Sequence, residues 1–129
     1  MASQQFLLIV LVVLIIGATI AAAVFLFNDH SASSNRDGVT SDLLKLSVRV
    51  YQYYVRPKAW GGGEKSFQGL TISYLTANPR NANGTYSVTS VTTTEVILRG
   101  VGIERGNDGN LITATMTIFP DSTYLSVAN

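Results

Sequence analysis

The sequence predicts an α+β fold, in which a long N-terminal hydrophobic helix continues into an amphipathic helix packed on a small antiparallel β-sheet. Three observations predict it. Phe6–Phe27 is an uncharged apolar run, Val39–Val55 carries apolar residues at helical spacing, and the chain from Tyr86 onward alternates as strands do. The predicted segments are a polar lead (1–5), a transmembrane or filament-core helix (6–27), a linker and amphipathic helix (28–57) and a small β domain (58–129).

The apolar run Phe6–Phe27 is long enough to cross a membrane. At about 1.5 Å rise per residue its helix measures about 33 Å, against a hydrocarbon core of about 30 Å. Met1–Gln5 carries no Lys or Arg and the run is longer than that of a secretory signal, so we expect no cleaved signal. Cleavage near Ala21–Ala23 is the minor alternative. We expect a cytoplasmic N-terminus at insertion, with the remainder outside.

Small side chains gather in the second half of this helix. Pairs four residues apart, such as Gly17 with Ala21 and Ala18 with Ala22, lie on adjacent stripes where neighbouring helices can approach closely. The alternative is a single-pass anchor in which the alanines have no packing role. The candidate helix-packing residues are Phe6, Leu11, Gly17, Ala18, Ala21, Ala22 and Phe25.

Composition limits what the remaining residues can do. The chain has 129 residues, which leaves room for one small exported domain beyond the anchor. It has no cysteine and one histidine, so disulfides and thiolate metal sites are excluded and no cofactor is expected. A net charge of +1 argues against nucleic-acid binding. Charged residues make up only 13%, which predicts that neighbouring copies or glycan cover part of the surface.

Helical periodicity resumes after Asn28–Gly38, a polar stretch that predicts a linker, a cap or a loosened helix. The amphipathic helix should end at Arg56-Pro57, because proline disfavours helix in the residue before it. Its core-facing side is predicted from apolar residues three and four apart, with others beside them: Val39, Leu43, Leu46, Val50 and Tyr54, flanked by Leu44, Val48, Tyr51 and Val55.

An antiparallel sheet of three or four strands follows a short mixed segment and a turn-rich loop. The predicted strands are Tyr86–Val91, Glu95–Glu104, Leu111–Phe119 and Thr123–Val127.

Asp108-Gly109 predicts a two-residue hairpin loop between the second and third strands. That loop would pair Ile103 with Ala114 and Val101 with Met116. Both pairs would then lie on the core face, which the same register assigns to Ile97, Ile112 and Ile118, with Thr113, Thr115 and Thr117 on the half-wetted face.

Several patterns resemble chemical sites, and each has a simpler structural interpretation. Asp29-His30 suggests a catalytic pair, yet adjacent helical residues diverge and no nucleophile is positioned beside them, so a polar cluster flanking the anchor is favoured. Asn107–Asn110 offers calcium-type oxygens but only one carboxylate, so a hairpin turn is favoured. Asn83 begins a candidate glycosylation sequon, Asn83-Gly84-Thr85.

Aromatic residues cluster near the end of the amphipathic helix, where they could form a binding platform or an electron path. Core and interface packing is the commoner use of such side chains and is favoured here. The residues concerned are Tyr51, Tyr53, Tyr54 and Trp60.

The order of parts resembles that of type IV pilins and related filament subunits, and Phe6–Gly17 (FLLIVLVVLIIG) is similar to the apolar start of mature pilins. Two positions depart from the family pattern. Gln5 precedes Phe6 where the family's leader-peptidase site has Gly or Ala with basic residues upstream, and Val10 stands where the family has Glu at the fifth mature position.

The resemblance implies a structural protein and no enzyme: a subunit whose N-terminal helices pack into the core of an extracellular filament, with the β-domains displayed outside. Its implied partners are copies of itself, the membrane before assembly, and an inner-membrane assembly machinery. The alternative is a single-pass membrane-anchored, exported β-domain of an envelope complex. An enzyme ranks third, since no acid–base or nucleophile set can be assembled from these residues.

Overall fold

The computed structural model describes residues 2–128, and one helix, α1 (Ala2–Val55), makes up much of that chain. Its backbone is helical throughout, so of the alternatives predicted for Asn28–Gly38 the linker and the cap are wrong, and the stretch continues the helix. Ser and Asn each lower helix propensity by only about 0.5 kcal/mol relative to Ala, and the stretch contains no proline. The chain divides into two compact units, residues 1–31 and 32–129.

α1 ends at Val55, as the proline at position 57 predicts. A 3₁₀ turn, η1 (Lys58–Trp60), follows and is closed by Gly61, whose φ of +82° is readily adopted only by glycine. A short helix, α2 (Ile72–Leu75), then leads into the sheet.

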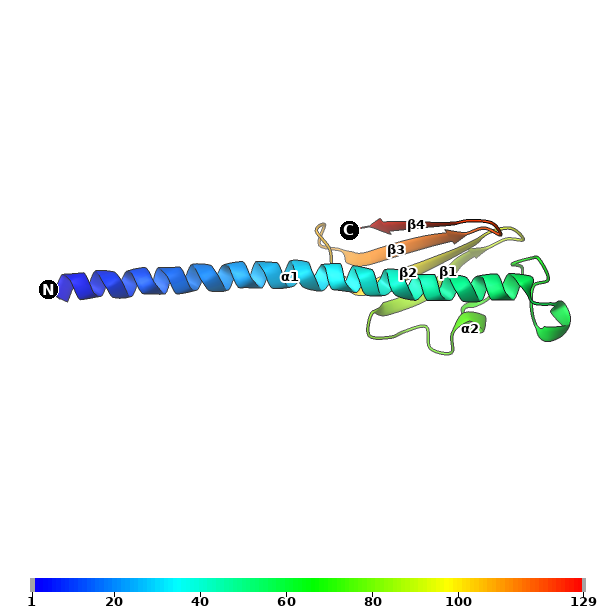
Figure 1. Cartoon of the computed structure of the whole chain (residues 1–129), viewed down its shortest axis with the longest axis horizontal. Coiled ribbons are helices and arrows are strands. Elements are labelled where there is room, and N and C mark those ends of the chain that lie inside the picture. The colour runs from blue at the N-terminus through cyan, green and yellow to red at the C-terminus, as the bar shows by residue number, and fades with distance from the viewer. Residues whose placement is uncertain (1, 129) are drawn as a thin grey trace. The chain divides into compact units, whose positions relative to one another are not determined.

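The sheet has four antiparallel strands in sequence order: β1 (Gly84–Val91), β2 (Val96–Arg105), β3 (Leu111–Ile118) and β4 (Thr123–Ala128). The α+β fold and the four strands predicted from alternation are therefore confirmed. In Figure 1, β4 forms one edge of the sheet and β1, beside α2, forms the other.

The core lies between one side of α1 and one face of the sheet. Val39, Leu43 and Val50 are fully buried on the helix, and Leu98 and Met116 are fully buried on the central strands. Burying each such side chain contributes about 1.5–3 kcal/mol. Phe67, Leu70 and Leu75 from the loop and α2 complete the cluster.

The predicted apolar side of the amphipathic helix is partly wrong. Tyr53, rather than Tyr54, completes the buried row, with Tyr54 half-buried beside it. The flanking residues Leu44, Val48, Tyr51 and Val55 are 51–57% exposed. A helix lying on a sheet covers a single stripe of its own surface, so these flanking positions turn away from the core.

The predicted register between β2 and β3 is also wrong. The loop closes through a bond from the Gly106 N–H to the Asn110 carbonyl, so it holds three residues, and Gly109 takes the left-handed position at φ +80°. A further irregularity lies between Val101 and Arg105.

The longer loop and the irregularity together shift the pairing of β2 with β3 by an odd number of residues from the predicted register. The side chains of β2 therefore exchange faces of the sheet. Met116 pairs with Leu98 and Ala114 with Gly100, in place of Val101 and Ile103. The core face of β2 is therefore Val96, Leu98, Gly100 and Gly102, while the faces predicted for β3 are confirmed.

Asn35 joins α1 to the irregular segment of β2. Its side chain is only 7% exposed, and its Oδ1 accepts the backbone N–H groups of Ile103 (3.1 Å) and Glu104 (3.2 Å). Its Nδ2 donates to the carbonyl of Asn83 at 2.7 Å. Gly102 makes room for it, because a Cβ there would lie 2.2 Å from Oδ1. One amide thus satisfies three backbone groups from two distant segments.

Candidate assembly surface

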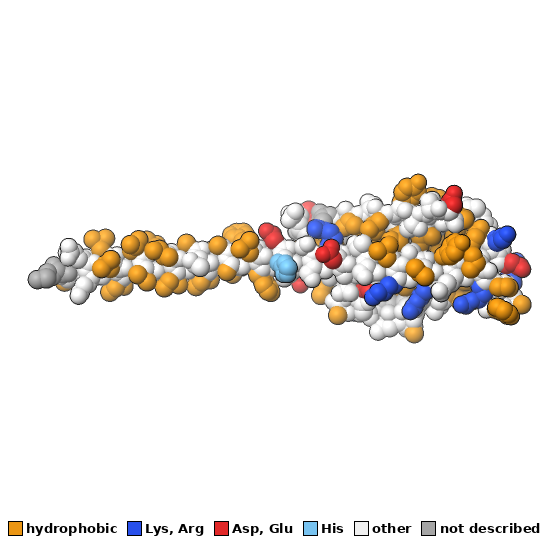
Figure 2. Space-filling model, in the orientation of Figure 1, with side chains coloured by type: hydrophobic (Ala, Val, Ile, Leu, Met, Phe, Trp, Pro, Cys, Tyr) orange, Lys and Arg blue, Asp and Glu red, His pale blue; other side chains and the backbone are white. Residues whose placement is uncertain are grey.

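The first half of α1 presents an apolar surface on every side. All large apolar side chains from Phe6 to Phe27 are exposed, from 41% at Val10 to 73% at Phe25. Figure 2 shows these side chains along the whole visible face of the segment. Thr19 is the one residue from Phe6 to Phe27 with a hydroxyl. That hydroxyl donates to the carbonyl of Ile15 at 2.9 Å, so its hydrogen bond is formed within the helix. By length and composition this helix can cross a membrane.

Most of the predicted helix-packing residues share one side of this helix. At about 100° per residue, Leu11, Gly17, Ala18, Ala21, Ala22 and Phe25 fall within an arc of about 140°, and Phe6 lies about a quarter turn from its centre. The space beside Gly17 is open: among the described residues, nothing beyond the adjoining helix backbone would lie within 4 Å of a Cβ added there. The small side chains Gly17, Ala18, Ala21 and Ala22 therefore form a short strip on this side of the helix, with the bulkier Leu11 before it and Phe25 after it along the chain.

A second exposed apolar stripe was not predicted from the sequence. Leu44, Val48, Tyr51 and Val55 recur at spacings of four, three and four residues on α1. At about 100° per residue the stripe lies nearly opposite the buried side of the helix. The sequence feature that could have predicted this stripe is the total width of the apolar surface on the helix, which exceeds what one sheet can cover.

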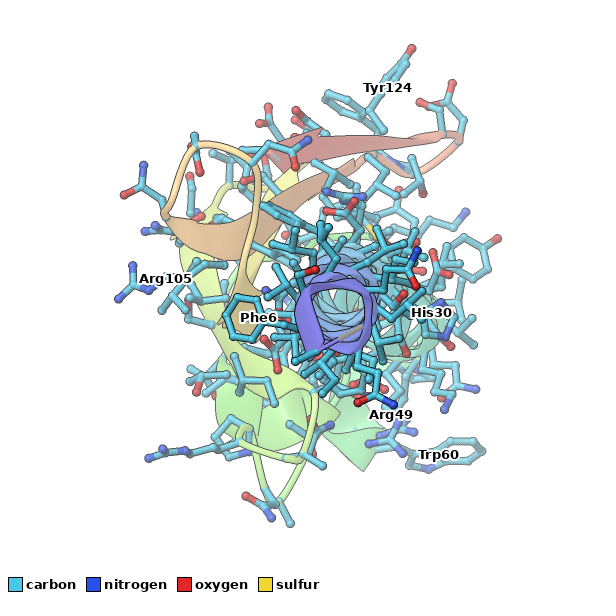
Figure 3. The ribbon with its side chains drawn as sticks, turned by 90° about the vertical axis from the view of Figure 1, so that its left-hand side faces the viewer. Phe6, His30, Arg49, Trp60, Arg105 and Tyr124 are labelled. Carbon is cyan, nitrogen blue, oxygen red and sulfur yellow. The ribbon has the colours of Figure 1, made fainter. Side chains whose placement is uncertain are left out.

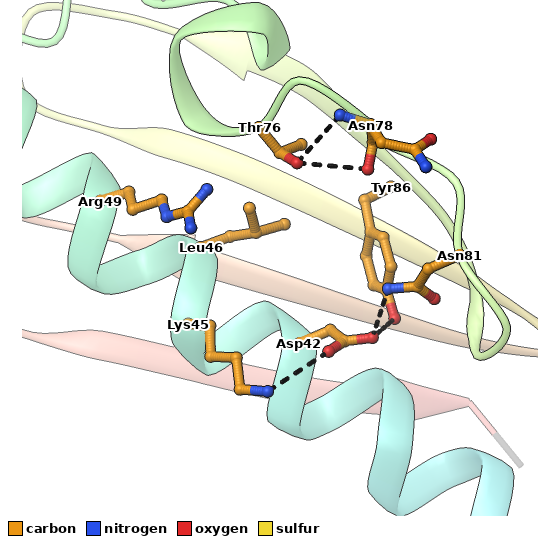
Figure 4. Close-up of a pocket in the computed structure, with 8 residues that line it drawn as sticks. All are labelled: Asp42, Lys45, Leu46, Arg49, Thr76, Asn78, Asn81 and Tyr86. Atoms are coloured by element: carbon orange, nitrogen blue, oxygen red, sulfur yellow. Dashed lines mark hydrogen bonds and ion pairs between the residues drawn. The ribbon is translucent and has the colours of Figure 1, made fainter.

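A polar cluster centred on Asp42 ties α1 to the loop before β1. Asp42 Oδ2 accepts hydrogen bonds from Tyr86 Oη (2.6 Å), Asn83 Nδ2 (2.9 Å) and Asn81 Nδ2 (3.0 Å). Lys45 Nζ lies 4.0 Å from Oδ1. Asp42, Lys45, Asn81 and Tyr86 line a small open hollow of about 120 Å³ (Figure 4). Arg49 also lines it, and its guanidinium donates to the Leu75 carbonyl.

The cluster shifts two pKa values in ways that stabilise it. Burial raises the pKa of Asp42, but the hydrogen bonds from Tyr86, Asn83 and Asn81, together with the charge of Lys45, outweigh burial and lower it below 3.8. Burial, with the bond to Asp42 and the Asp42 charge, raises the pKa of Tyr86. Asp42 thus remains an acceptor and Tyr86 a donor at neutral pH.

We expect Asp42 to make the domain more stable above pH 4 than at lower pH. Because its pKa is lowered on folding, its contribution is present above the unfolded value and is lost as the pH falls through the folded value. The difference in thermal unfolding between the wild type and Asp42→Asn should therefore be largest near pH 7 and shrink as the pH falls below 4. A difference that does not change over this range would contradict this role.

The other predicted sites lie apart from one another. Asp29 and His30 are exposed, successive positions on α1. Asp108 accepts from the N–H of Asn110 at 2.8 Å, as expected of a hairpin turn. Asn83 is half-buried and its Nδ2 donates to Asp42, so a glycan attached there would leave that nitrogen one N–H for this bond and would have to fit beside the Asp42 cluster.

Three of the four aromatic residues near the end of α1 pack against other rings. Tyr53 lies 5.4 Å from Tyr74 between ring centres and donates from Oη to the Gln68 carbonyl at 2.7 Å. The ring of Tyr54 lies 4.8 Å from that of Phe67 and 6.4 Å from that of Tyr51. Trp60 differs, since it is 77% exposed and projects outward in Figure 3.

Within residues 2–128, no three His, Asp or Glu side chains come together as a metal site. The comparisons with known proteins add no family. No family model matches this chain, no curated protein is significantly similar to it, and no solved structure significantly matches its fold. Function is therefore inferred from the molecule's own surfaces, chiefly the apolar helix.

Proposed function

We propose that this chain is the structural subunit of an extracellular pilus-like filament, anchored in the inner membrane before assembly. The observation that supports the proposal most directly is the helix from Phe6 to Phe27, whose large side chains are exposed on every side. Outside a membrane such a helix is stable only when several neighbours surround it, and each Å² removed from water contributes about 25 cal/mol. Copies of the same helix provide those neighbours.

Two further features support packing among copies. The strip containing Gly17 and Ala21 allows close approach of helix backbones. The exposed stripe from Leu44 to Val55 extends apolar surface onto the part of α1 that carries the domain. A lone anchor in lipid needs neither feature, so together they favour the filament over a single-pass anchored domain.

Electron microscopy of material sheared from producing cells tests the proposal, with mass spectrometry to identify the subunit. Uniform thin fibres that contain this chain are the expected result. Detergent resistance of those fibres provides a second measurement, because a bundle of buried apolar helices should not dissociate readily. Recovery of the chain only from detergent-extracted membranes, as a monomer or small oligomer, would support the anchored-domain alternative instead.

A further inference from the structure

Strand β4 leaves one edge of the sheet without a partner strand among the described residues. The hairpin to β3 closes through a bond from the Phe119 N–H to the Ser122 carbonyl, at 2.8 Å. Because antiparallel pairs alternate between bonded and non-bonded positions, Tyr124 and Ser126 direct their backbone groups to β3. Thr123, Leu125 and Val127 consequently direct theirs to the free edge.

The opposite edge of the sheet differs, because a loop covers the start of β1. The Tyr86 N–H donates to the Pro79 carbonyl at 2.8 Å, and Arg80 forms an antiparallel bridge with Thr85. Among the described residues β4 lacks such a cover along its length, and its sequence (TYLSVA) contains no charge and no proline. Those are the residues that natural proteins use to prevent pairing at an exposed edge.

The side chains of β4 also favour a partner. Leu125 pairs with Met116 and Val127 with Ala114, both of which are fully buried, so Leu125 and Val127 lie on the core face of the sheet. They nevertheless remain 42% and 36% exposed. On the other face, Tyr124 is 65% exposed and points away from the domain (Figure 3). Apolar surface and free backbone groups thus coincide on one strand.

We propose that β4 pairs antiparallel with β4 of a second copy, joining two four-stranded sheets into one of eight strands. In this register Leu125 lies opposite Leu125, and Thr123 lies opposite Val127. A two-fold axis through Leu125 satisfies the outward backbone groups of both strands at once, and uncharged strands meet without repulsion.

The two-fold axis has a consequence that rests on the proposed filament. Within residues 32–129, Figure 1 shows β4 running in the opposite direction to the end of α1, so this part of α1 points in opposite directions in the two paired copies. Subunits of a filament built from parallel helices all point the same way. The β4 contact therefore joins two filaments of opposite direction and bundles them side by side.

Cysteine cross-linking of the full chain in detergent tests the pairing. Leu125→Cys would place two Cα atoms about 5.5 Å apart, within the range for a disulfide. Ser126→Cys is the matched control. Position 126 of each copy lies opposite Tyr124 of the other copy, so the Cα atoms of the two introduced cysteines are about 8 Å apart, beyond that range. The natural chain contains no cysteine, so any disulfide dimer comes from the introduced thiol.

Under mild oxidation we expect at least five times more dimer from Leu125→Cys than from Ser126→Cys. No dimer from Leu125→Cys, or equal amounts from both, would overturn the pairing. The detergent experiment needs no filament. The β4 pairing and the proposed filament function can therefore be refuted independently of each other. Filaments without the dimer would refute the pairing alone, whereas the dimer without filaments would refute the proposed function and leave the pairing intact.

Discussion

Asn35→Ala is expected to lower the domain's free energy of unfolding by about 3 kcal/mol, since it removes three hydrogen bonds that each contribute about 1 kcal/mol net. These part-buried bonds join Asn35 to the N–H groups of Ile103 and Glu104 and to the carbonyl of Asn83. For a domain of this size the loss corresponds to a fall in Tm of about 12 °C or more. Thermal unfolding in detergent, followed by near-ultraviolet circular dichroism of the tyrosines, measures it.

Two variants make the test specific. Ser34→Ala changes an exposed neighbour on the same helix and should shift the free energy of unfolding by less than about 0.5 kcal/mol. Gly102→Ala should destabilise through the same contact, because its Cβ would lie 2.2 Å from Asn35 Oδ1. The double variant should then lose less than the sum of the two single losses. Full additivity would show that the two residues act independently.

Gly17→Leu is expected to reduce filament yield at least tenfold while leaving membrane insertion intact. A leucine at this position projects from the strip of small side chains and separates the helix backbones, and a loss of about 1.4 kcal/mol per contact already weakens association tenfold. Insertion should persist, because leucine contributes about −0.3 to −0.6 kcal/mol to it. Filament yield is measured by shearing and quantitative immunoblotting, and insertion by resistance to carbonate extraction.

Ile16→Leu is the matched control for Gly17→Leu. It introduces the same side chain one position away, on the bulky side of the helix, and conserves volume. Its filament yield should remain within about twofold of the wild type, as expected of a volume-conserving change. Normal yield from Gly17→Leu would show that helices do not pack closely along this strip.

Local patterns predicted the elements of this fold well. Pro57 marked the end of α1, and the alternating threonines at positions 113, 115 and 117 marked the outer face of β3. Both signals act within a few residues, where proline sterics and the two-residue period of a strand determine the outcome. The apolar run from Phe6 likewise predicted a helix from composition alone.

Features that depend on distant segments could not be predicted in this way. Asp108-Gly109 suits a loop of two residues or of three, and only the bond between Gly106 and Asn110 distinguishes them. The irregularity before Arg105 donates two backbone hydrogen bonds to Asn35, almost seventy residues earlier. Asn35 itself stands in a polar stretch, where nothing in the local sequence distinguishes a buried amide from an exposed one.

Because Asn35 is far from its partners in the sequence, it is synthesised well before them. Asn83 follows it by 48 residues, and Ile103 and Glu104 follow by 68 and 69. At about 5–20 residues per second, a ribosome needs about 3–14 s to make the last of these after Asn35. During that interval the core side of α1 has no sheet to cover it. Val39, Leu43 and Val50 of a nascent chain therefore stay uncovered by the sheet until β2 and β3 have emerged.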